Sequence, residues 1–446
     1  MPNQTPNQTA STFAPLRQLP PEGSYKKGDV LVVFGELFAR GYANGIVDEA
    51  ERAGLKVIYS TVGRRDETGK LRALNEEELK AKAGQTLINI PLEAGFDMEP
   101  SAEGITPVQQ LAGVKLGEWQ NTKLDWAKIE DSRKRGTERF KTQVEAWMKE
   151  VEKHIPKGAN VLFAHTMAGG VPRAKIMMPV MNWVFKGTGD RHLSSETFWK
   201  SDMGKFTDMS FEDVTANTFD HLLTLSKHLR EKIEKDGGTV RYVAYGYHGT
   251  EVLIKGEYRW QAYSPYLQAW AKIKLENFSK EATKAGLKTT VYNAPEILTN
   301  STGIFVGVEV PLYPFLTALK KEAGSVPKVK EALAKCQSLL KDGVTFEEIQ
   351  AFTDKTLTSE AIQETSVWEI WPTHNTKSQM ETLIGAAGHL VDLHKDPKDL
   401  ITFVLSEEIF RSTGYIMFHD SFKPQAPVLW LGHDVLAKAL ATGKTL

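Results

Sequence analysis

Residues 240–299 read VRYVAYGYHGTEVLIKGEYRWQAYSPYLQAWAKIKLENFSKEATKAGLKTTVYNAPEILT. The start of this stretch, residues 238–244, is dense in apolar, aromatic and β-branched side chains, which predicts a buried strand. Residues 267–285 carry apolar side chains at helical spacing, and a second β-rich segment covers residues 289–292. Strand, helix and strand in this order are typical of a parallel sheet, so we expect an α/β protein.

Three polar residues of this unit are candidates for chemistry: Tyr247 at the end of the first strand, Tyr263 in the loop and Lys272 on the first turns of the helix. Ligands of open α/β sheets bind outside the carboxyl ends of the strands. A lysine near a tyrosine favours the phenolate, which lowers the pKa of the phenol toward neutrality. On spacing alone, however, a strand-end tyrosine and a solvated helix lysine are the more common interpretation.

A resemblance to a known family adds weight to the chemical interpretation. Tyr263 and Lys272 are separated by eight residues, Trp260 lies three residues before the tyrosine, and residues 244–251 read AYGYHGTE. This pattern resembles the single-chain trans-2-enoyl reductases, the Tyr-x8-Lys branch of the short-chain dehydrogenase/reductase superfamily. Residues 310–322, which begin Val-Pro-Leu-Tyr, are similar to the substrate-side helix of that branch. The resemblance implies a Rossmann-type doubly wound parallel sheet.

The turn after the first expected strand is the first candidate cofactor site. Residues 29–34 read DVLVVF, a short buried strand, and an amphipathic helix follows the glycine-punctuated segment 35–45. This order places backbone N–H groups and a helix N-terminus against a dinucleotide pyrophosphate. The residues that resemble the superfamily's glycine turn are Gly35, Arg40, Gly41 and Gly45.

The tip of the second expected strand bears on the choice of dinucleotide. Arg64 and Arg65 follow this strand, where an acidic residue would bind the ribose 2′-hydroxyl of NADH. A guanidinium pairs well with a phosphate, so the arginines favour NADPH, with NADH as the alternative. A solvated arginine pair is about as good an explanation.

The remaining cofactor residues come from the resemblance. The segment HTMAGG, residues 165–170, follows the fourth expected strand and is similar to the Asn-Asn-Ala-Gly segment that walls the cofactor, which implies roles for Ala168 and Gly169. Thr299 resembles a threonine that contacts the nicotinamide or the phosphates. Asn217 matches an asparagine that bulges a helix beside the lysine. We interpret His165 as structural.

Composition limits the partners and the compartment. The 446 residues are 41% hydrophobic and carry a net charge of -1, so no basic field indicates a nucleic acid or an anionic membrane. A lone Cys336 fits a reducing compartment. No apolar run reaches the ~18 residues of a membrane span, and residues 1–26 lack the apolar centre of a signal peptide. We expect a cytoplasmic protein without a metal site.

The expected organisation is a flexible arm over residues 1–26 and one Rossmann-type domain over residues 27–446. Residues 303–395 are mostly helical in pattern, and the superfamily places its substrate-covering segment here, so we expect an enlarged helical substrate-covering insertion. Residues 401–422 resemble the terminal helix, a Thr413-Gly414 turn and the last strand. The oligomeric state is not readable from the sequence.

The leading hypothesis is an NAD(P)H-dependent reductase of 2-enoyl thioesters carried by coenzyme A or acyl carrier protein. The resemblance implies that Tyr263 stabilises the negative charge on the thioester oxygen, that Lys272 holds the ribose and tunes the phenol, and that Tyr247 assists. Tyr258 and Tyr266 compete for the role of Tyr263. Two alternatives remain: a carbonyl reductase of the same superfamily and a non-catalytic dinucleotide-binding protein.

Overall fold

A seven-stranded parallel sheet forms the centre of the molecule. The computed structural model describes residues 13–23, 25–262, 268–299, 307 and 309–442. The strand order is β11-β10-β7-β6-β1-β2-β5, and every neighbouring pair is parallel. The strands are β1 Val30–Glu36, β2 Lys56–Thr61, β5 Thr86–Pro91, β6 Val161–His165, β7 Val240–Gly246, β10 Thr289–Asn293 and β11 Val428–Trp430. The α/β fold expected from the sequence is confirmed.

The direction in which strands are added reverses between β1 and β6. From β1 the chain adds β2 and β5 on one side, and then β6, β7, β10 and β11 on the other. Such a reversal leaves a crevice at the carboxyl ends of the two central strands, because the following loops run in opposite directions. The fold therefore prepares a ligand site at this edge.

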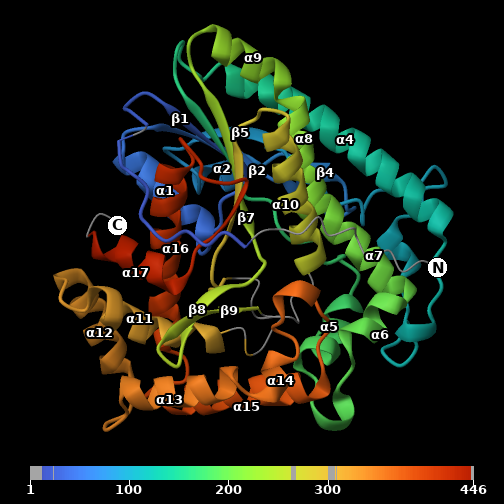
Figure 1. The fold of residues 1–446 in the computed structure, drawn as a ribbon. Coiled ribbons are helices and arrows are strands. Elements are labelled where there is room, and N and C mark those ends of the chain that lie inside the picture. Colours follow the sequence, from blue (N-terminus) through green and yellow to red (C-terminus); the bar gives the residue numbers. More distant parts are fainter. Residues whose placement is uncertain (1–12, 24, 263–267, 300–306, 308, 443–446) are drawn as a thin grey trace.

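Helices cover both faces of the sheet (Figure 1). One face packs against α1 Tyr42–Arg52, α16 Ile401–Asp420 and α17 His433–Ala441. The other packs against α4 Trp126–Glu152, α8 Thr218–Leu225 and α10 Ala269–Lys284. Successive side chains of a strand point to opposite faces, and both faces are buried here, which explains the nearly continuous apolar runs of β1 and β6.

The contact between α1 and α16 corrects one interpretation of the sequence. Thr413 and Gly414 lie inside the continuous helix α16, not in a turn before the last strand. A Cβ atom on Gly414 would lie 1.9 Å from the backbone carbon of Gly45, so the two glycines allow the helices to touch through their backbones. The last strand, β11, follows eight residues after α16.

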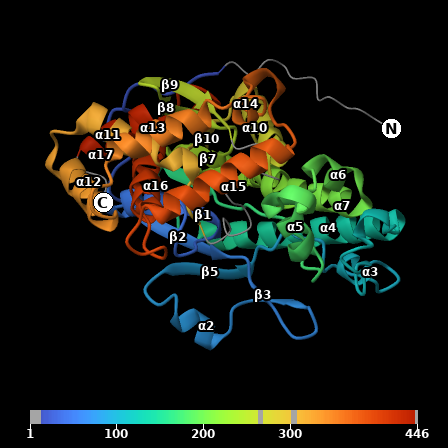
Figure 2. The same ribbon diagram turned by 90° about the horizontal axis from the view of Figure 1, so that it is seen from below.

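The expected helical content of residues 303–395 is present. It consists of α11 Pro314–Ala323, α12 Pro327–Leu339, α13 Phe346–Leu357, α14 Glu360–Gln363 and α15 Lys377–Asp392. Leu319, Val329, Ile349 and Leu383 of these helices share one apolar cluster with α16 and α17. These helices lie together below the carboxyl ends of the strands in Figure 1, and Figure 2 shows α13 and α15 side by side.

A hairpin occupies much of the segment between residues 247 and 263 that is expected from the sequence to be a loop. Strands β8 Thr250–Ile254 and β9 Glu257–Gln261 pair antiparallel. Lys255 and Gly256 form a two-residue turn with φ values of 51° and 80°, as tight hairpins require. The hairpin accounts for the long separation between Tyr247 and α10.

The described part of the expected N-terminal arm contacts the sheet. Pro15 forms a parallel bridge with Trp430 of β11, and the backbone N–H of Leu16 donates to the Trp430 oxygen at 2.8 Å. Leu16 and Tyr25 are buried. The division of the chain into an arm and one domain stays a prediction.

The other elements lie around this framework. They are β3 Arg64–Arg65, β4 Leu71–Arg72, α2 Glu76–Lys80, α3 Pro107–Gln110, α5 Met177–Lys186, α6 Ser195–Lys200, α7 Asp202–Phe211, a π-helical segment Glu212–Asn217 and α9 Lys227–Lys235. Among the described residues, no helix combines the length and apolar character needed to cross a membrane.

Candidate active site

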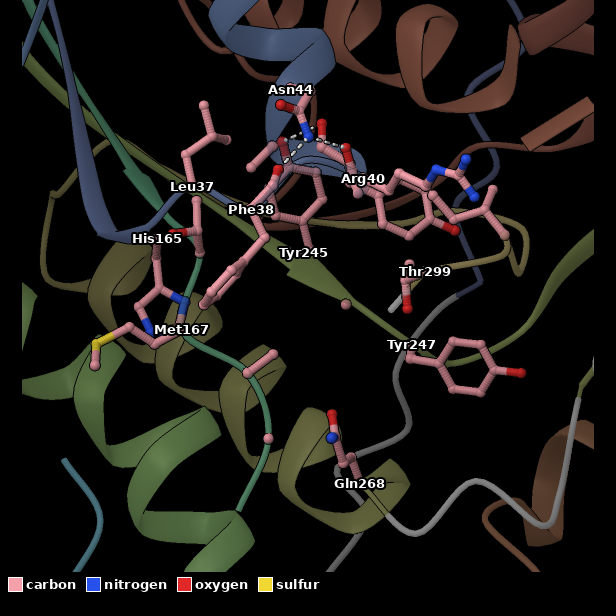
Figure 3. A pocket seen from close by; sticks show the side chains of 18 of the residues that line it. Leu37, Phe38, Arg40, Asn44, His165, Met167, Tyr245, Tyr247, Gln268 and Thr299 are labelled. Carbon is pink, nitrogen blue, oxygen red and sulfur yellow. Dashed lines mark hydrogen bonds between the residues drawn. The ribbon is translucent and has the colours of Figure 1, made fainter. Parts of the chain in front are cut away.

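A cavity of about 220 Å³ lies at the carboxyl edge of the sheet where the strand order reverses (Figure 3). Its wall combines the loop after β1, the loop after β6, the end of β7, the start of α10 and the segment after β10. Of the residues proposed from the sequence, the lining includes Arg40, Gly41, Ala168, Gly169, Tyr247, Lys272 and Thr299. The structure thus brings together residues that are more than 250 positions apart.

The loop between β1 and α1 forms one wall. The side-chain amide of Asn44 donates to the carbonyl oxygens of Phe38 at 2.9 Å and Gly41 at 3.2 Å, which holds the loop against the start of α1. Gly41 precedes α1, so the first N–H groups of the helix open beside the cavity. Backbone N–H groups in this position suit a pyrophosphate.

Two glycines of the proposed turn do not line the cavity. Gly35 has a φ of 124°, and a Cβ atom there would lie 2.5 Å from the Thr166 hydroxyl, so this glycine lets β1 approach the loop after β6. Gly45 lies inside α1, where a Cβ atom would be 2.1 Å from the Phe410 carbonyl oxygen of α16. Both glycines have packing reasons that the sequence alone does not distinguish from cofactor binding.

The loop after β6 is held by the π-helical segment. The Thr215 hydroxyl donates to the Gly169 carbonyl oxygen at 2.9 Å and accepts from the Gly169 N–H at 3.2 Å. A Cβ atom on Gly169 would meet nothing within 4 Å, and the residue has a φ of 124°. Gly169 therefore exposes backbone to open cavity space, which suits close approach by a flat ligand.

His165 ends β6 and also lines the cavity. The Thr218 hydroxyl donates its proton to the Val214 carbonyl oxygen at 2.8 Å, so the Nε2 atom of His165 must donate to that hydroxyl, also at 2.8 Å. Burial, and then the charge of Lys272, hold the pKa of His165 well below its usual value. The side chain is a neutral, fixed part of the wall, which agrees with its interpretation as structural.

Lys272 is the buried cation of the site. Only 4% of the residue is exposed, and its Nζ atom donates to the Tyr245 carbonyl oxygen at 2.6 Å. Burial lowers the pKa of Lys272 to about 8, although the carboxyl groups of Glu276 and Glu296 oppose the shift. Such a lysine is poised near neutrality, as catalytic lysines often are.

A buried polar network lies behind Lys272. Glu276, one helical turn further along α10, is fully buried and accepts from the Nδ2 atom of Asn293 at 3.0 Å. It also contacts the Nδ1 atom of His248 at 3.2 Å, and the His248 ring stacks between Trp368 and Trp371. Glu276 was not identified from the sequence, although its spacing of four residues from Lys272 is a signal that could have indicated a shared helix face.

The candidate tyrosines of the described chain differ in their position relative to the cavity. Tyr247 is buried and lines the cavity, with its ring 6.2 Å from that of Trp371. The Tyr258 hydroxyl donates to Glu322 of α11 at 2.7 Å, and Tyr258 does not line the cavity. Tyr263 and Tyr266 lie outside the described residues. Tyr258 is therefore the weakest of the three competitors named from the sequence.

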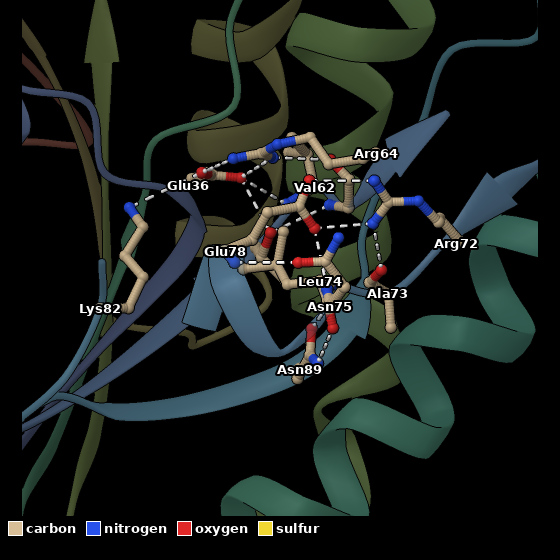
Figure 4. A network of polar contacts seen from close by, with 12 residues as sticks. Glu36, Val62, Arg64, Arg72, Ala73, Leu74, Asn75, Glu78, Lys82 and Asn89 are labelled. Carbon is tan, nitrogen blue, oxygen red and sulfur yellow. Dashed lines mark hydrogen bonds and ion pairs between the residues drawn. The ribbon is translucent and has the colours of Figure 1, made fainter. Parts of the chain in front are cut away.

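Both arginines of the pair contact carboxylates, and Figure 4 shows the contact between Arg64 and Glu36. Arg64 makes two hydrogen bonds of 2.9 Å to Glu36, and the Nε atom of Arg65 donates to Glu93 at 3.2 Å. Glu36 and Glu93 also line a second cavity of about 220 Å³ next to the first, together with Asp97 and Arg173, whereas Arg64 and Arg65 do not. Both guanidinium groups thus have carboxylate partners, and a role of the pair in binding a 2′-phosphate stays a prediction.

Asn217 ends the π-helical segment, as a bulged helix would place it. Its Nδ2 atom donates to Asp213 at 2.6 Å, and Arg133 of α4 makes two 2.8 Å hydrogen bonds to the same carboxylate. The Asn217 side chain is thus part of an ion-pair network and does not line the cavity. Among the described residues, no cluster of side chains suits a metal ion.

Comparison with known proteins decides the family. The family model described as enoyl-acyl carrier protein reductase FabMG matches residues 12–440. The chain belongs to the FabMG family of enoyl-acyl carrier protein reductases. A FabMG enzyme is an oxidoreductase that uses NAD(P)H, so the protein is an enoyl thioester reductase of fatty acid metabolism, and the carbonyl reductase and non-catalytic alternatives are not supported.

Two solved FabMG structures are similar to this chain along almost its whole length. An apo FabMG structure is 47% identical over 98% of this chain and 99% of its own, with a TM-score of 0.93. An NADH-bound FabMG structure is 39% identical over 97% of this chain and 99% of its own, with a TM-score of 0.77. No curated protein sequence matches the chain.

Proposed function

We propose that the cavity beside Lys272 binds NADH together with the enoyl group of an acyl carrier protein substrate. The observation that supports this most strongly is the buried ammonium group of Lys272, which faces a cavity also lined by Tyr247 and by the backbone of the loops after β1 and β6. A buried cation beside a phenol suits the stabilisation of negative charge on a thioester oxygen.

The residues present fit a nicotinamide dinucleotide. The N-terminus of α1 after Gly41 suits the pyrophosphate, and the unobstructed backbone of Gly169 suits a planar ring. In this proposal, the ammonium group of Lys272 holds a ribose hydroxyl. When bound, the dinucleotide supplies the hydride that the reaction requires.

NADH is preferred over NADPH in this proposal, in contrast to the expectation from Arg64 and Arg65. The second cavity, next to the loop after β1, is lined by three carboxylates, those of Glu36, Glu93 and Asp97, and by one cation, Arg173, which pairs with Glu93 and Asp97. Arg64 and Arg65 are also held by carboxylates. Carboxylates accept hydrogen bonds from a ribose diol and repel a 2′-phosphate. The FabMG relative that contains NADH supports the same choice.

The chain's own residues then have distinct roles. A phenol hydroxyl donates to the thioester oxygen, where negative charge develops as the double bond is reduced. Lys272 makes the region positive and so favours that charge. We assign the phenol to Tyr263 of the Tyr-x8-Lys motif, with Tyr247 as the assisting tyrosine on the described wall, and we propose membership of the corresponding branch of the short-chain dehydrogenase/reductase superfamily.

The carrier is proposed to be acyl carrier protein, because the family is described by that substrate. Coenzyme A remains the competing carrier. The proposal also keeps the helices of residues 314–392 as the substrate cover, one domain for the reductase and a cytoplasmic location.

The test measures oxidation of NADH and NADPH with crotonyl groups on acyl carrier protein and on coenzyme A. We expect turnover with NADH and the acyl carrier protein substrate to have the highest kcat/KM, and Tyr263→Phe to lose about a hundred-fold or more of it. Tyr258→Phe is the matched control, because its hydroxyl is bound to Glu322. Equal loss in the control, or a preference for NADPH, would contradict the proposal.

A further inference from the structure

Glu296 carries a carboxyl group in the wall of the main cavity, and the proposed function gives this group no role. It follows Pro295 in the segment after β10 and lines the main cavity together with Lys272 and Tyr247. It also lines a small adjoining cavity of about 20 Å³ that Tyr247 shares. Glu296 therefore lies at the junction of the two spaces, which Tyr247, the proposed assisting tyrosine, also lines.

Several other enclosed carboxyl groups of the described residues have partners that explain them, whereas Asp208, whose pKa burial raises to about 6, has no such partner but does not line the cavity. Glu36 accepts hydrogen bonds from Arg64 and Thr61, Glu49 pairs with Arg52 and His419, and Glu276 accepts from Asn293. Within the described part of the chain, the Glu296 carboxyl forms no hydrogen bond. The residue is only partly buried and lines the cavity, so its carboxyl group is available to a ligand there.

The protonation of Glu296 follows from its surroundings. Burial raises the pKa of Glu296 to about 8, even though the ammonium group of Lys272 acts in the opposite direction. Among the described residues, the other titratable groups that line the cavity are His165, which is neutral, Tyr245 and Tyr247 at the end of β7, and Glu36, Arg40 and Tyr42 on the β1 side. At neutral pH, Glu296 therefore carries a proton beside a charged Lys272.

We propose that Glu296 is the general acid that protonates the α-carbon of the substrate. The inference rests on the proposed placement of the enoyl group beside Lys272 and Tyr247. Hydride addition at the β-carbon leaves an electron pair shared between the α-carbon and the thioester oxygen. The O–H bond of Glu296 breaks, and its proton forms the new C–H bond with that electron pair. The resulting carboxylate is stabilised by Lys272 and regains a proton from water.

Delivery of a proton from a fixed side chain has a stereochemical consequence. A donor on one wall protonates one face of the α-carbon, whereas bulk water reaching a released enolate protonates both faces. Reduction in D₂O marks the new bond with deuterium. The configuration at the α-carbon therefore reports the proton donor separately from the overall rate.

The experiment compares the full-length wild type with Glu296→Gln and Glu296→Asp, with Glu309→Gln as the control. Glu309 is also a partly buried carboxyl whose pKa is raised by burial, but it does not line the cavity. We expect one deuterium configuration for the wild type, Glu309→Gln and Glu296→Asp, and mixed configurations with at least a ten-fold lower kcat for Glu296→Gln.

A second readout needs neither cofactor nor turnover. Infrared difference spectra of the free protein across pH 6 to 9 report protonated carboxyl groups, and we expect a band that titrates near the pKa of about 8 given for Glu296 and that is missing in Glu296→Gln. An unchanged deuterium configuration and kcat in Glu296→Gln would overturn the inference, as would the absence of the band from the wild type. If the wild type itself fails to oxidise NADH with an enoyl substrate, the proposed function fails instead.

Discussion

The Nζ atom of Lys272 donates a hydrogen bond of 2.6 Å to the backbone carbonyl oxygen of Tyr245. Tyr245 lies near the end of β7, and Lys272 lies in the first turn of α10. This hydrogen bond fixes a buried cation at the floor of the cavity. It also links β7, which ends directly before Tyr247, to the helix that carries Lys272, so the hydrogen bond fixes the relative position of these two elements.

Replacing Lys272 by methionine tests this placement. Methionine retains the length and packing of the side chain but removes the charge and the hydrogen bond. We expect kcat/KM for the enoyl substrate to fall by about a hundred-fold or more, with little change in thermal stability. The control is Lys274→Met, because Lys274 pairs with Glu212 and does not line the cavity. A similar loss in both variants would argue against a specific role for Lys272.

The pH dependence should report the charge of Lys272. The protonated forms of Lys272 and of the proposed acid Glu296 are both the active ones, so activity is retained below their pKa values of about 8 and lost as the pH rises through that value. Removing the negative charge of Glu276 in Glu276→Gln lowers the pKa of Lys272 further, because that charge favours the ammonium form. We expect the alkaline limb of kcat/KM to move to lower pH, so that the variant loses more activity at pH 8 than at pH 6. An unshifted limb would show that Lys272 is not the titrating group.

Much of the sheet could be predicted from the sequence, because buried parallel strands are short apolar runs between helices. The runs at residues 29–34 and 240–244 became β1 and β7 for this reason. The glycines were harder: Gly41 and Gly169 line the cavity, whereas Gly45 and Gly414 pack two helices together. A glycine in a sequence does not reveal what approaches it, and only the fold shows this.

The site was predictable in part for a related reason. Tyr247 could be proposed because it follows an expected strand, and Lys272 because it lies on the first turns of the expected helix. The resemblance to the Tyr-x8-Lys reductases assigns a role to both residues. The engagement of Arg64 with Glu36, 28 residues apart, depends on the neighbouring positions of β1 and β2, which the local sequence does not encode. Glu296 was not identified as a functional residue, because only its enclosure beside Lys272 distinguishes it from other glutamates.

The clamp between Thr215 and Gly169 should affect cofactor binding more than chemistry. Thr215→Val keeps the shape of the side chain and removes the hydroxyl that bonds to both backbone groups of Gly169. The lost hydrogen bonds are worth about 1 kcal/mol net, so we expect the KM for NADH to rise about five-fold with kcat nearly unchanged. Thr207→Val is the control, because its hydroxyl bonds only to Met203 within α7. A fall in kcat with unchanged KM would contradict this role.

The close contact between Gly45 and Gly414 should make the protein sensitive to any side chain added at this point. Alanine in a helix is favoured over glycine by about 1 kcal/mol, but the Cβ atom of Gly414→Ala would overlap the backbone of α1. We expect the free energy of unfolding to fall by about 1–3 kcal/mol, measured by urea denaturation. Gly385→Ala on the exposed side of α15 has no atom within 4 Å of its Cβ and should raise stability by up to about 1 kcal/mol. Stabilisation by both variants would show that the helices separate readily.

The most direct test of the central claim is hydrogen exchange of the full chain with and without NADH, followed by mass spectrometry. The account predicts that NADH slows exchange in the loop after β1, residues 37–44, and in the loop after β6, residues 166–170, which both line the cavity at the strand reversal. The contrasting region is the roomier cavity of about 780 Å³ lined by residues 109, 111–114 and 173–176. Protection confined to that region, with no change in the two loops, would contradict the placement of the cofactor beside Lys272.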